Sequence, residues 1–393
     1  MFGRSVGCLC VSAVLAGGCS GTQPPTLAIG SPAPAFSLPG VDGQTHALAD
    51  YAASPVLAVV FTCNHCPVSE LYERRIQQLY ADYRDRGVAV VAINPDSPKT
   101  IALKELAYSD LADTLADMQA RATYRHLEYP YLYDGDAQAA ATAFKIVATP
   151  QIFVFDQQRT LRYQGRLDDN LREDEVKTRD ARNAIDALLA GKPVPVTDTT
   201  AFGCTTKWLS KASGVEQEWT RIQAEPVTVE AVGAEDLKKI RANATDKVML
   251  VNLWSTNCAT CAGQFFDLET TYRMYRKRAF DLITINTNGP ADAPQVLAFL
   301  KKEYASSQNK QFATADRAGL QAAWGEKWNP AQPLTMVIAP GGEALYRKEG
   351  KIDILEVRRS ILAAMPDTKG YIGSKAYWER TVAELKARSK GKS

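Results

Sequence analysis

Apolar residues along the chain form short runs that predict strands. The runs "VLAVVFT" at 56–62 and "VMLVNLW" at 248–254 are nearly continuous, which is typical of central strands covered by helices on both faces. The later runs "RTLRYQG" and "GEALYRKEG" alternate more strongly between apolar and polar residues. We therefore expect these two segments to lie near a sheet edge.

The predicted elements follow the same order in both halves of the chain. The first half predicts, in order, strand 56–62, helix 67–87, strand 88–94, helices 99–124 and 136–145, strands 151–156 and 159–165, and helix 174–189. The second half predicts strand 247–254, helix 262–278, strand 280–286, helix 293–305, strands 333–340 and 342–350, and helix 354–364. One supersecondary plan used twice predicts an α/β class chain with two tandem domains, each a mixed central sheet covered by helices on both faces.

The length of 393 residues agrees with two domains. The segment "AGKPVPVTDTTAFG" contains glycine, two prolines and a polar run, so it predicts a boundary near 192–206. We expect domains at 27–191 and 228–370, a linker at 192–227, and a C-terminal helix with a basic tail at 371–393. The 46 basic and 44 acidic side chains give a net charge of +2, which does not favour a nucleic-acid partner.

The first 26 residues have the outline of a secretion signal followed by a polar tether. Arg4 precedes an apolar centre, and small residues lead to Cys19 in "LAGGC". This segment resembles a bacterial lipoprotein signal, which implies lipidation of Cys19 and a periplasmic or membrane-anchored location. Plain cleavage, uncleaved anchoring and a cytoplasmic protein remain alternatives.

Two closely spaced cysteine pairs carry the candidate chemistry. Cys63 and Cys66 in "CNHC", and Cys258 and Cys261 in "CATC", each lie where a predicted strand passes into a helix. Positions i and i+3 on a helix are about 5–6 Å apart, a separation that suits a disulfide. The helix N-terminus also favours a thiolate on the first cysteine, so each pair predicts an exposed redox site with a lowered cysteine pKa.

Each half of the chain resembles the thioredoxin superfamily, because each has such a cysteine pair and a proline that opens a strand about 80 residues later. The resemblance covers roughly 28–190 and 228–365, and the lead-in "IGSPAPAFSLPGVDGQTHALADY" is similar to redoxins related to alkyl hydroperoxide reductase and to cytochrome-maturation thioredoxins. It implies disulfide exchange with protein thiols and an unidentified redox partner, without a cofactor. It also implies cis peptide bonds at Pro150 and Pro333, with substrate grooves at Thr149–Pro150 and Gln332–Pro333.

Alternative interpretations of the cysteine pairs remain open. Peroxiredoxins carry a threonine three residues before the attacking cysteine, where this chain has Val60 and Ser255. The long stretch of sequence between the two pairs disfavours one zinc site shared by both. Copper binding by Cys63, His65 and Cys66 is an outlying alternative. The sequence therefore predicts no metal site. A structural disulfide would close too small a loop to stabilise the fold much.

Neighbouring residues are expected to tune the sites. A partly positive His65 would stabilise the Cys63 thiolate and make the first site the more oxidising one, whereas the alternative is an exposed histidine without effect. At the second site, Asn257 stands where the family usually has a large residue.

Counting cysteines leaves Cys204 without a partner in "TAFGCTTKW", because Cys8 and Cys10 belong to the signal segment. We expect Cys204 either to form a transient disulfide with Cys63 or Cys258, as a relay, or to be a buried inert thiol.

The sequence therefore predicts an exported thiol–disulfide oxidoreductase with catalytic Cys63, Cys66, Cys258 and Cys261. A peroxiredoxin-like thiol peroxidase and a non-catalytic thioredoxin-fold binding module are the alternatives.

Overall fold

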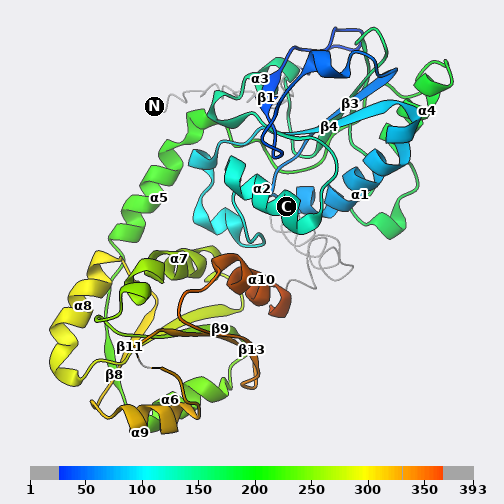
Figure 1. Cartoon of the computed structure of the whole chain (residues 1–393). Coiled ribbons are helices and arrows are strands. Elements are labelled where there is room, and N and C mark those ends of the chain that lie inside the picture. Colours follow the sequence, from blue (N-terminus) through cyan, green and yellow to red (C-terminus); the bar gives the residue numbers. More distant parts are fainter. Residues whose placement is uncertain (1–25, 330, 366–393) are drawn as a thin grey trace, which may run out of the picture.

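A computed structural model of the chain describes residues 26–329 and 331–365. The expected signal segment with Cys8, Cys10 and Cys19, and the expected helix at 371–393, lie outside the described residues. Two α/β domains lie one above the other, joined along one side by helix α5 (Ser213–Gln223) (Figure 1).

The first domain is built on a five-stranded mixed sheet with the order β5-β4-β3-β6-β7. Its strands are β3 (Val56–Phe61), β4 (Val88–Asn94), β5 (Tyr131–Tyr133), β6 (Gln151–Phe155) and β7 (Leu161–Gly165). Strands β3, β4 and β5 are parallel, while β6 and β7 are antiparallel to their neighbours. A short hairpin of β1 (Ser37–Pro39) and β2 (Thr45–Ala47) precedes this sheet.

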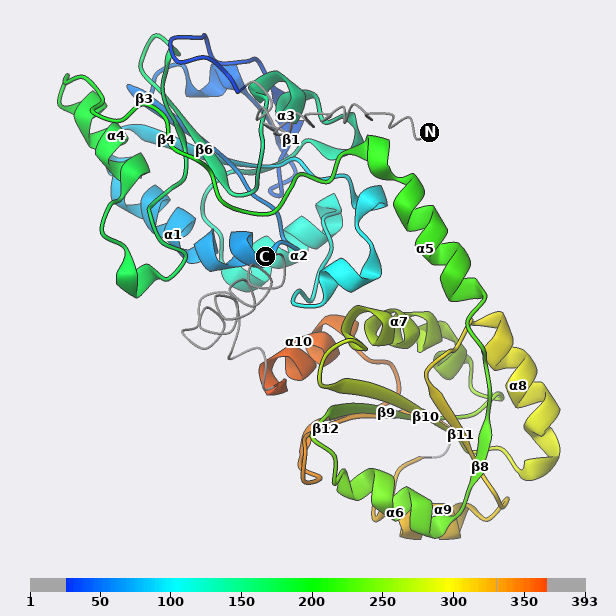
Figure 2. The ribbon, with the colours of Figure 1, turned by 180° about the vertical axis from the view of Figure 1, so that it is seen from behind.

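The apolar run of β3 is buried on both faces, as predicted. Val56, Ala58 and Val60 face one hydrophobic core, and Leu57 and Val59 face the other. The first core is completed by helices α1 (Pro67–Tyr83), α2 (Leu115–Arg125) and α4 (Asp180–Leu189), and the second by α3 (Ala139–Phe144). Figure 2 shows α1 and α4 together on the same face of the sheet.

The second domain has a six-stranded sheet with the order β13-β12-β9-β10-β11-β8. The strands are β8 (Glu230–Val232), β9 (Val248–Trp254), β10 (Phe280–Asn286), β11 (Gln308–Phe312), β12 (Leu334–Ile338) and β13 (Ala344–Glu349). As in the first domain, the central strand β9 is parallel to one neighbour and antiparallel to the other. The predicted edge positions of β7 and β13 are confirmed.

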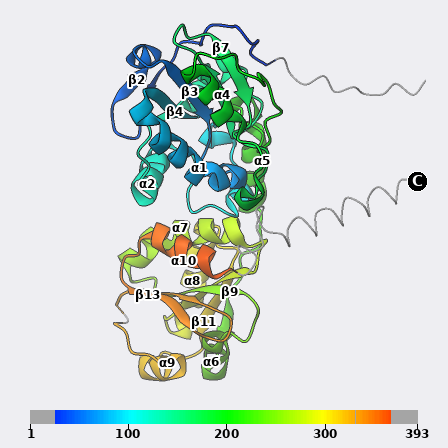
Figure 3. The same ribbon diagram turned by 90° about the vertical axis from the view of Figure 1, so that its right-hand side faces the viewer.

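Helices cover both faces of the second sheet. They are α6 (Ala234–Ala242), α7 (Ala259–Tyr275), α8 (Ala293–Lys302), α9 (Arg317–Trp324) and α10 (Ile354–Ala364). Leu237 and Trp324 place α6 and α9 on one core, whereas Leu268 and Ile361 place α7 and α10 on the other. Figure 3 shows that α7 and α10 form the side of this domain that faces the first domain. Both halves are therefore mixed α/β sheets flanked by helices.

Two predicted helices differ from the structure. The expected helix at 99–124 is helical only over α2, which begins after the capping residue Thr114. The preceding segment forms short 3-10 turns instead, because Ile101 and Leu106 are buried in a core of the second domain. The helix expected from 174 begins only at Asp180.

The two domains touch through this segment before α2. Arg359 of α10 forms an ion pair of 2.6 Å with Asp110, which also pairs with Arg121 of α2 at 3.0 Å. Across the described ranges, no helix has the length and apolarity needed to cross a membrane.

Candidate redox sites

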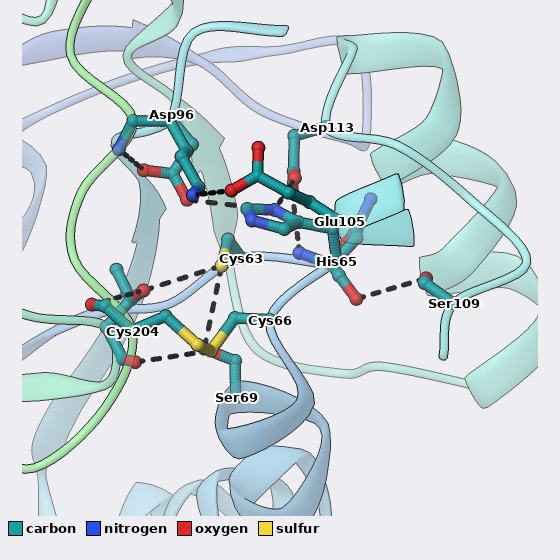
Figure 4. The surroundings of a disulfide bond; sticks show 12 residues. Cys63, His65, Cys66, Ser69, Asp96, Glu105, Ser109, Asp113 and Cys204 are labelled. Atoms are coloured by element: carbon teal, nitrogen blue, oxygen red, sulfur yellow. Dashed lines mark hydrogen bonds and ion pairs between the residues drawn. A yellow bond between two sulfur atoms is a disulfide. The ribbon is translucent and has the colours of Figure 1, made fainter. Parts of the chain in front are cut away.

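Cys66 lies at the start of α1, immediately after the turn that leaves β3. It occupies the N-cap position, and Pro67 follows at the first helical position, where a missing N–H group costs no hydrogen bond. The sulfur of Cys66 forms a disulfide with Cys204, with a Cα–Cα distance of 6.2 Å (Figure 4). The expected pairing of Cys63 with Cys66 is therefore wrong for this state, because residues 203 and 204 lie beside the site.

Cys63 is a free and buried thiol. Its sulfur lies 3.6 Å from the Ser69 hydroxyl and 3.5 Å from the Thr149 hydroxyl. Burial raises the pKa of Cys63 to about 11, the negative charge of Asp96 adds to this increase, and His65 opposes it. The expected exposed cysteine with a lowered pKa is thus wrong, although His65 acts in the expected direction.

His65 is buried, not exposed, and it contacts two carboxylates. Its Nδ1 atom pairs with Asp113 and lies 3.9 Å from the Oδ2 atom of Asp96. Burial is the largest single effect and favours the neutral imidazole, but the charges of Asp113 and Cys63 and the hydrogen bonds to them together outweigh it, so the pKa of His65 lies well above its usual value. Burial also raises the pKa of Asp96, to about 6. Figure 4 shows both carboxylates beside the imidazole.

Asp96 and Asp113 were missed by the sequence reasoning. Because β3 and β4 are parallel neighbours, the segments that follow them meet at one edge of the sheet, which brings Asp96 beside Cys63 and His65. The order of these segments along the chain could therefore have predicted that Asp96 lies near the first cysteine pair. Asp113 precedes α2 and accepts hydrogen bonds from the Asn64 N–H at 2.6 Å and from the side chain of Asn94 at 2.7 Å. No local pattern in the sequence indicates that contact.

The expected groove beside Pro150 is occupied by the chain itself. The Thr149–Pro150 peptide bond is cis. Thr149 and Cys204 form an antiparallel bridge in which each backbone N–H donates to the other residue's carbonyl at 2.9 Å. Gly203 fits closely here, since a Cβ atom at that position would lie 2.0 Å from the Thr149 carbonyl oxygen. The segment around Cys204 therefore takes the place of an extended peptide.

The second site contains the predicted pair. Cys258 and Cys261 form a disulfide with a Cα–Cα distance of 5.3 Å. Cys258 is the N-cap residue of α7, and its sulfur accepts a hydrogen bond of 3.1 Å from the Cys261 N–H. Trp254 and Phe265, with ring centroids 4.9 Å apart, pack in the same buried cluster.

The loop that carries Gln332 and Pro333 differs from its counterpart in the first domain. Within the described ranges the only cis bond is Thr149–Pro150, so the cis bond expected at Pro333 is wrong. The Pro333 carbonyl instead accepts a hydrogen bond of 2.9 Å from the Gly350 N–H, which ties the loop to the end of β13. The expected relay of Cys204 to Cys63 or Cys258 is also not what this state contains, because Cys204 is bonded to Cys66.

Comparisons with known proteins agree with two related domains. Residues 29–164 match the model of the AhpC/TSA family, and residues 205–357 match that of the Redoxin family. A protein of Mycobacterium tuberculosis (strain ATCC 25618 / H37Rv) named "Putative peroxiredoxin Rv2521" is 32% identical over 81 residues, which are 21% of this chain and 52% of that protein. The thiol-disulfide oxidoreductase ResA of Geobacillus thermodenitrificans is 33% identical over 78 residues, which are 20% of this chain and 44% of that protein.

Among solved structures, the hypothetical protein SMc02350 from Sinorhizobium meliloti 1021 is 34% identical, with 47% of this chain and 96% of that chain covered and a TM-score of 0.41. The chain spans about half the length of the curated relatives it matches. The sequence matches and the two equivalent sheets lead to the same assignment. The chain therefore belongs to the thioredoxin superfamily and carries two redoxin-type domains in tandem, the first of the AhpC/TSA family and the second of the Redoxin family.

Proposed function

We propose that this protein is a thiol–disulfide oxidoreductase that exchanges disulfides with protein substrates. The observation that carries this proposal is the Cys66–Cys204 disulfide, which holds an extended segment paired with the backbone of Thr149. A client segment with a cysteine would find the same backbone donor and acceptor once residues 203–205 leave.

The first site carries three cysteines close together, which allows an internal exchange. The Cys63 and Cys66 sulfurs both contact Thr149, at 3.5 Å from its hydroxyl and 3.6 Å from its carbonyl. Attack of the Cys63 thiolate on the Cys66 sulfur forms a Cys63–Cys66 bond, breaks the bond to Cys204, and leaves Cys204 as a thiolate that takes a proton. This step moves the disulfide without net oxidation.

Net electron transfer takes place with a client. A client thiolate attacks one sulfur of the Cys66–Cys204 bond and forms a mixed disulfide, and a second client thiol resolves it. The client leaves with a disulfide, and Cys66 and Cys204 remain as two thiols. The reverse sequence reduces a client disulfide. Cys258 and Cys261 would perform the same exchange in the second domain.

The test is a redox titration combined with a client reaction. Each disulfide is titrated against glutathione, with alkylation and mass mapping of the cysteines. We expect both bonds to have midpoint reduction potentials above about −300 mV. In the client reaction, a reduced two-cysteine peptide should gain one disulfide for each protein disulfide that is lost. The variants Cys66→Ser and Cys258→Ser separate the two sites. Midpoint reduction potentials below about −300 mV for both bonds would mark them as structural disulfides and would favour the binding-module alternative.

Peroxide reduction is the second candidate function. It is favoured by the AhpC/TSA match and by the name of the mycobacterial relative. Stoichiometric loss of hydrogen peroxide with formation of the Cys66–Cys204 bond, starting from reduced protein, would support it. The buried state of Cys63 in the disulfide form argues against Cys63 as the residue that peroxide attacks.

We also propose export of this protein and lipidation of Cys19. The two disulfides of the described chain are consistent with an oxidising compartment. Labelling of the wild-type protein with a radioactive fatty acid, but not of Cys19→Ala, is the expected result. Retention of both proteins in the cytoplasmic fraction would contradict export.

A further inference from the structure

Four potential metal ligands meet at the first site, one each from cysteine and histidine and two from aspartate. We propose that Cys63, His65, Asp96 and Asp113 form a zinc site that is available when Cys66 is bonded to Cys204. One ligand atom from each of the four side chains lies within 4.8 Å of the others, and all four residues are buried. The proposal goes beyond disulfide exchange and does not depend on it.

Asp96 supplies the observation that points to a ligand. Its side chain is completely buried, and its Oδ2 atom has no hydrogen-bond partner although it lies 3.9 Å from the Nδ1 atom of His65. A buried carboxylate oxygen without a donor is costly, and a bound cation would satisfy it. Figure 4 shows this carboxylate beside the imidazole of His65, which Asp113 also contacts.

The atoms that would not bind the ion are already held by other groups. The Oδ1 atom of Asp113 accepts hydrogen bonds from Asn64 and Asn94, and the Oδ1 atom of Asp96 accepts one of 2.7 Å from the Lys207 N–H. This arrangement orients the Oδ2 atoms of both carboxylates toward His65. Outer hydrogen bonds of this kind position metal ligands in known sites.

The local charge also favours a cation. Among the described residues, no lysine or arginine forms an ion pair with Asp96 or Asp113, whose ion pairs are with His65. The nearby Lys207 ammonium pairs with Glu105 instead. Two buried carboxylates therefore share one imidazole, and a divalent cation would balance their negative charge.

The donor set indicates zinc as the cation. Zinc binds cysteine sulfur, histidine nitrogen and carboxylate oxygen in four-coordinate sites, whereas magnesium and calcium prefer oxygen alone. The disulfide state decides whether the sulfur is available. Cys63 is a free thiol while Cys66 is bonded to Cys204, but a Cys63–Cys66 disulfide would remove it from the site. Cys66 is not available as a copper ligand in this state.

The test measures metal binding by the full chain. The protein is first freed of metal and oxidised, and mass mapping confirms that it contains the Cys66–Cys204 bond. Zn²⁺ is followed by competition with a chromophoric chelator, and Co²⁺ by its thiolate charge-transfer absorption. Because the other cysteines can also bind metal, the decisive quantity is the difference between wild type and Cys63→Ser. We expect wild type to bind one additional equivalent, with cobalt absorption that Cys63→Ser lacks.

Matched variants separate the site from general effects. Asp96→Asn should weaken zinc binding by more than the ~10–100-fold that loss of an outer hydrogen bond costs. Glu105→Gln, which removes a neighbouring carboxylate outside the cluster, and the double variant Cys258→Ala/Cys261→Ala should keep the wild-type affinity. Circular dichroism checks that each variant is folded, and if Asp96→Asn fails this check the comparison with Cys63→Ser decides. Equal binding by wild type and Cys63→Ser, or no binding by wild type, would overturn the proposal.

Discussion

The hydroxyl of Tyr275 in α7 donates a hydrogen bond of 2.8 Å to the carbonyl of Ser109 in the first domain. The Ser109 hydroxyl in turn donates at 3.3 Å to the carbonyl of Asn64, which lies between the two cysteines of the first site. Helix α7 begins beside Cys258. A short series of hydrogen bonds therefore links the helix of the second site to the turn of the first.

Tyr275→Phe should destabilise this contact without changing its packing. Loss of the hydroxyl leaves the buried Ser109 carbonyl without a donor, so we expect the free energy of unfolding to fall by about 1 kcal/mol. Urea unfolding measures the change. Tyr346→Phe is the matched control, because the Tyr346 hydroxyl is buried without a hydrogen-bond partner. An equal loss in both variants would show that the contact with Ser109 contributes nothing specific.

Cys204→Ser should destabilise the first domain more than Cys261→Ser destabilises the second. The Cys66–Cys204 bond spans 138 residues, whereas the Cys258–Cys261 bond spans three. A long closed loop restricts the unfolded chain more, which corresponds to about 2–5 kcal/mol for the first bond. Denaturant unfolding of oxidised proteins checks this order, and the reverse order would contradict it.

Gly203→Ala should shift the disulfide from Cys66–Cys204 toward Cys63–Cys66. The added methyl group would lie 2.0 Å from the Thr149 carbonyl oxygen, so residues 203 and 204 must move away from the site. Peptide mapping without reduction, after oxidation in air, gives the proportion of each bond. Gly214→Ala in α5 is the control, because a Cβ atom there has no neighbour within 4 Å. An unchanged proportion in Gly203→Ala would mean that the close fit does not select the pairing.

Glu269→Gln should flatten the pH dependence of stability. Burial raises the pKa of Glu269 from 4.5 to about 7, so the folded protein binds this proton more tightly than the unfolded chain does. Stability from this group is present below pH 4.5 and is lost as the pH rises toward 7, by up to about 3 kcal/mol. Urea unfolding at pH 5 and pH 8 tests this. Parallel pH profiles for wild type and variant would exclude Glu269 as the cause.

The central strands could be predicted because their sequences are almost entirely apolar. By contrast, β11 has the sequence "QNKQF" and β8 has only three residues, so neither gives a strand pattern, and they join the sheet through pairing with β10 and with each other. The segment at 98–113 has helical periodicity, but its apolar residues contact the other domain, and this tertiary contact outweighs local preference.

The site was predicted in its cysteines but not in its partners. Cys63, Cys66, Cys258 and Cys261 are marked by their spacing at the ends of strands. The bond from Cys66 to Cys204 depends on a backbone bridge formed by distant segments, and no local pattern contains that information. The same holds for Asp113, which reaches His65 only through the fold.

The Cys66–Cys204 bond has a mechanical consequence for the whole chain. While it is intact, the covalent connection to the second domain departs from Cys204 at the first site, not from the end of α4 at Leu189. Reduction removes this covalent link, but backbone hydrogen bonds at Thr197, Thr199 and Lys207 still hold the segment against the first domain. The disulfide therefore reinforces an attachment that hydrogen bonds already make, and its reduction weakens the hold of the first domain on the start of the connection to the second.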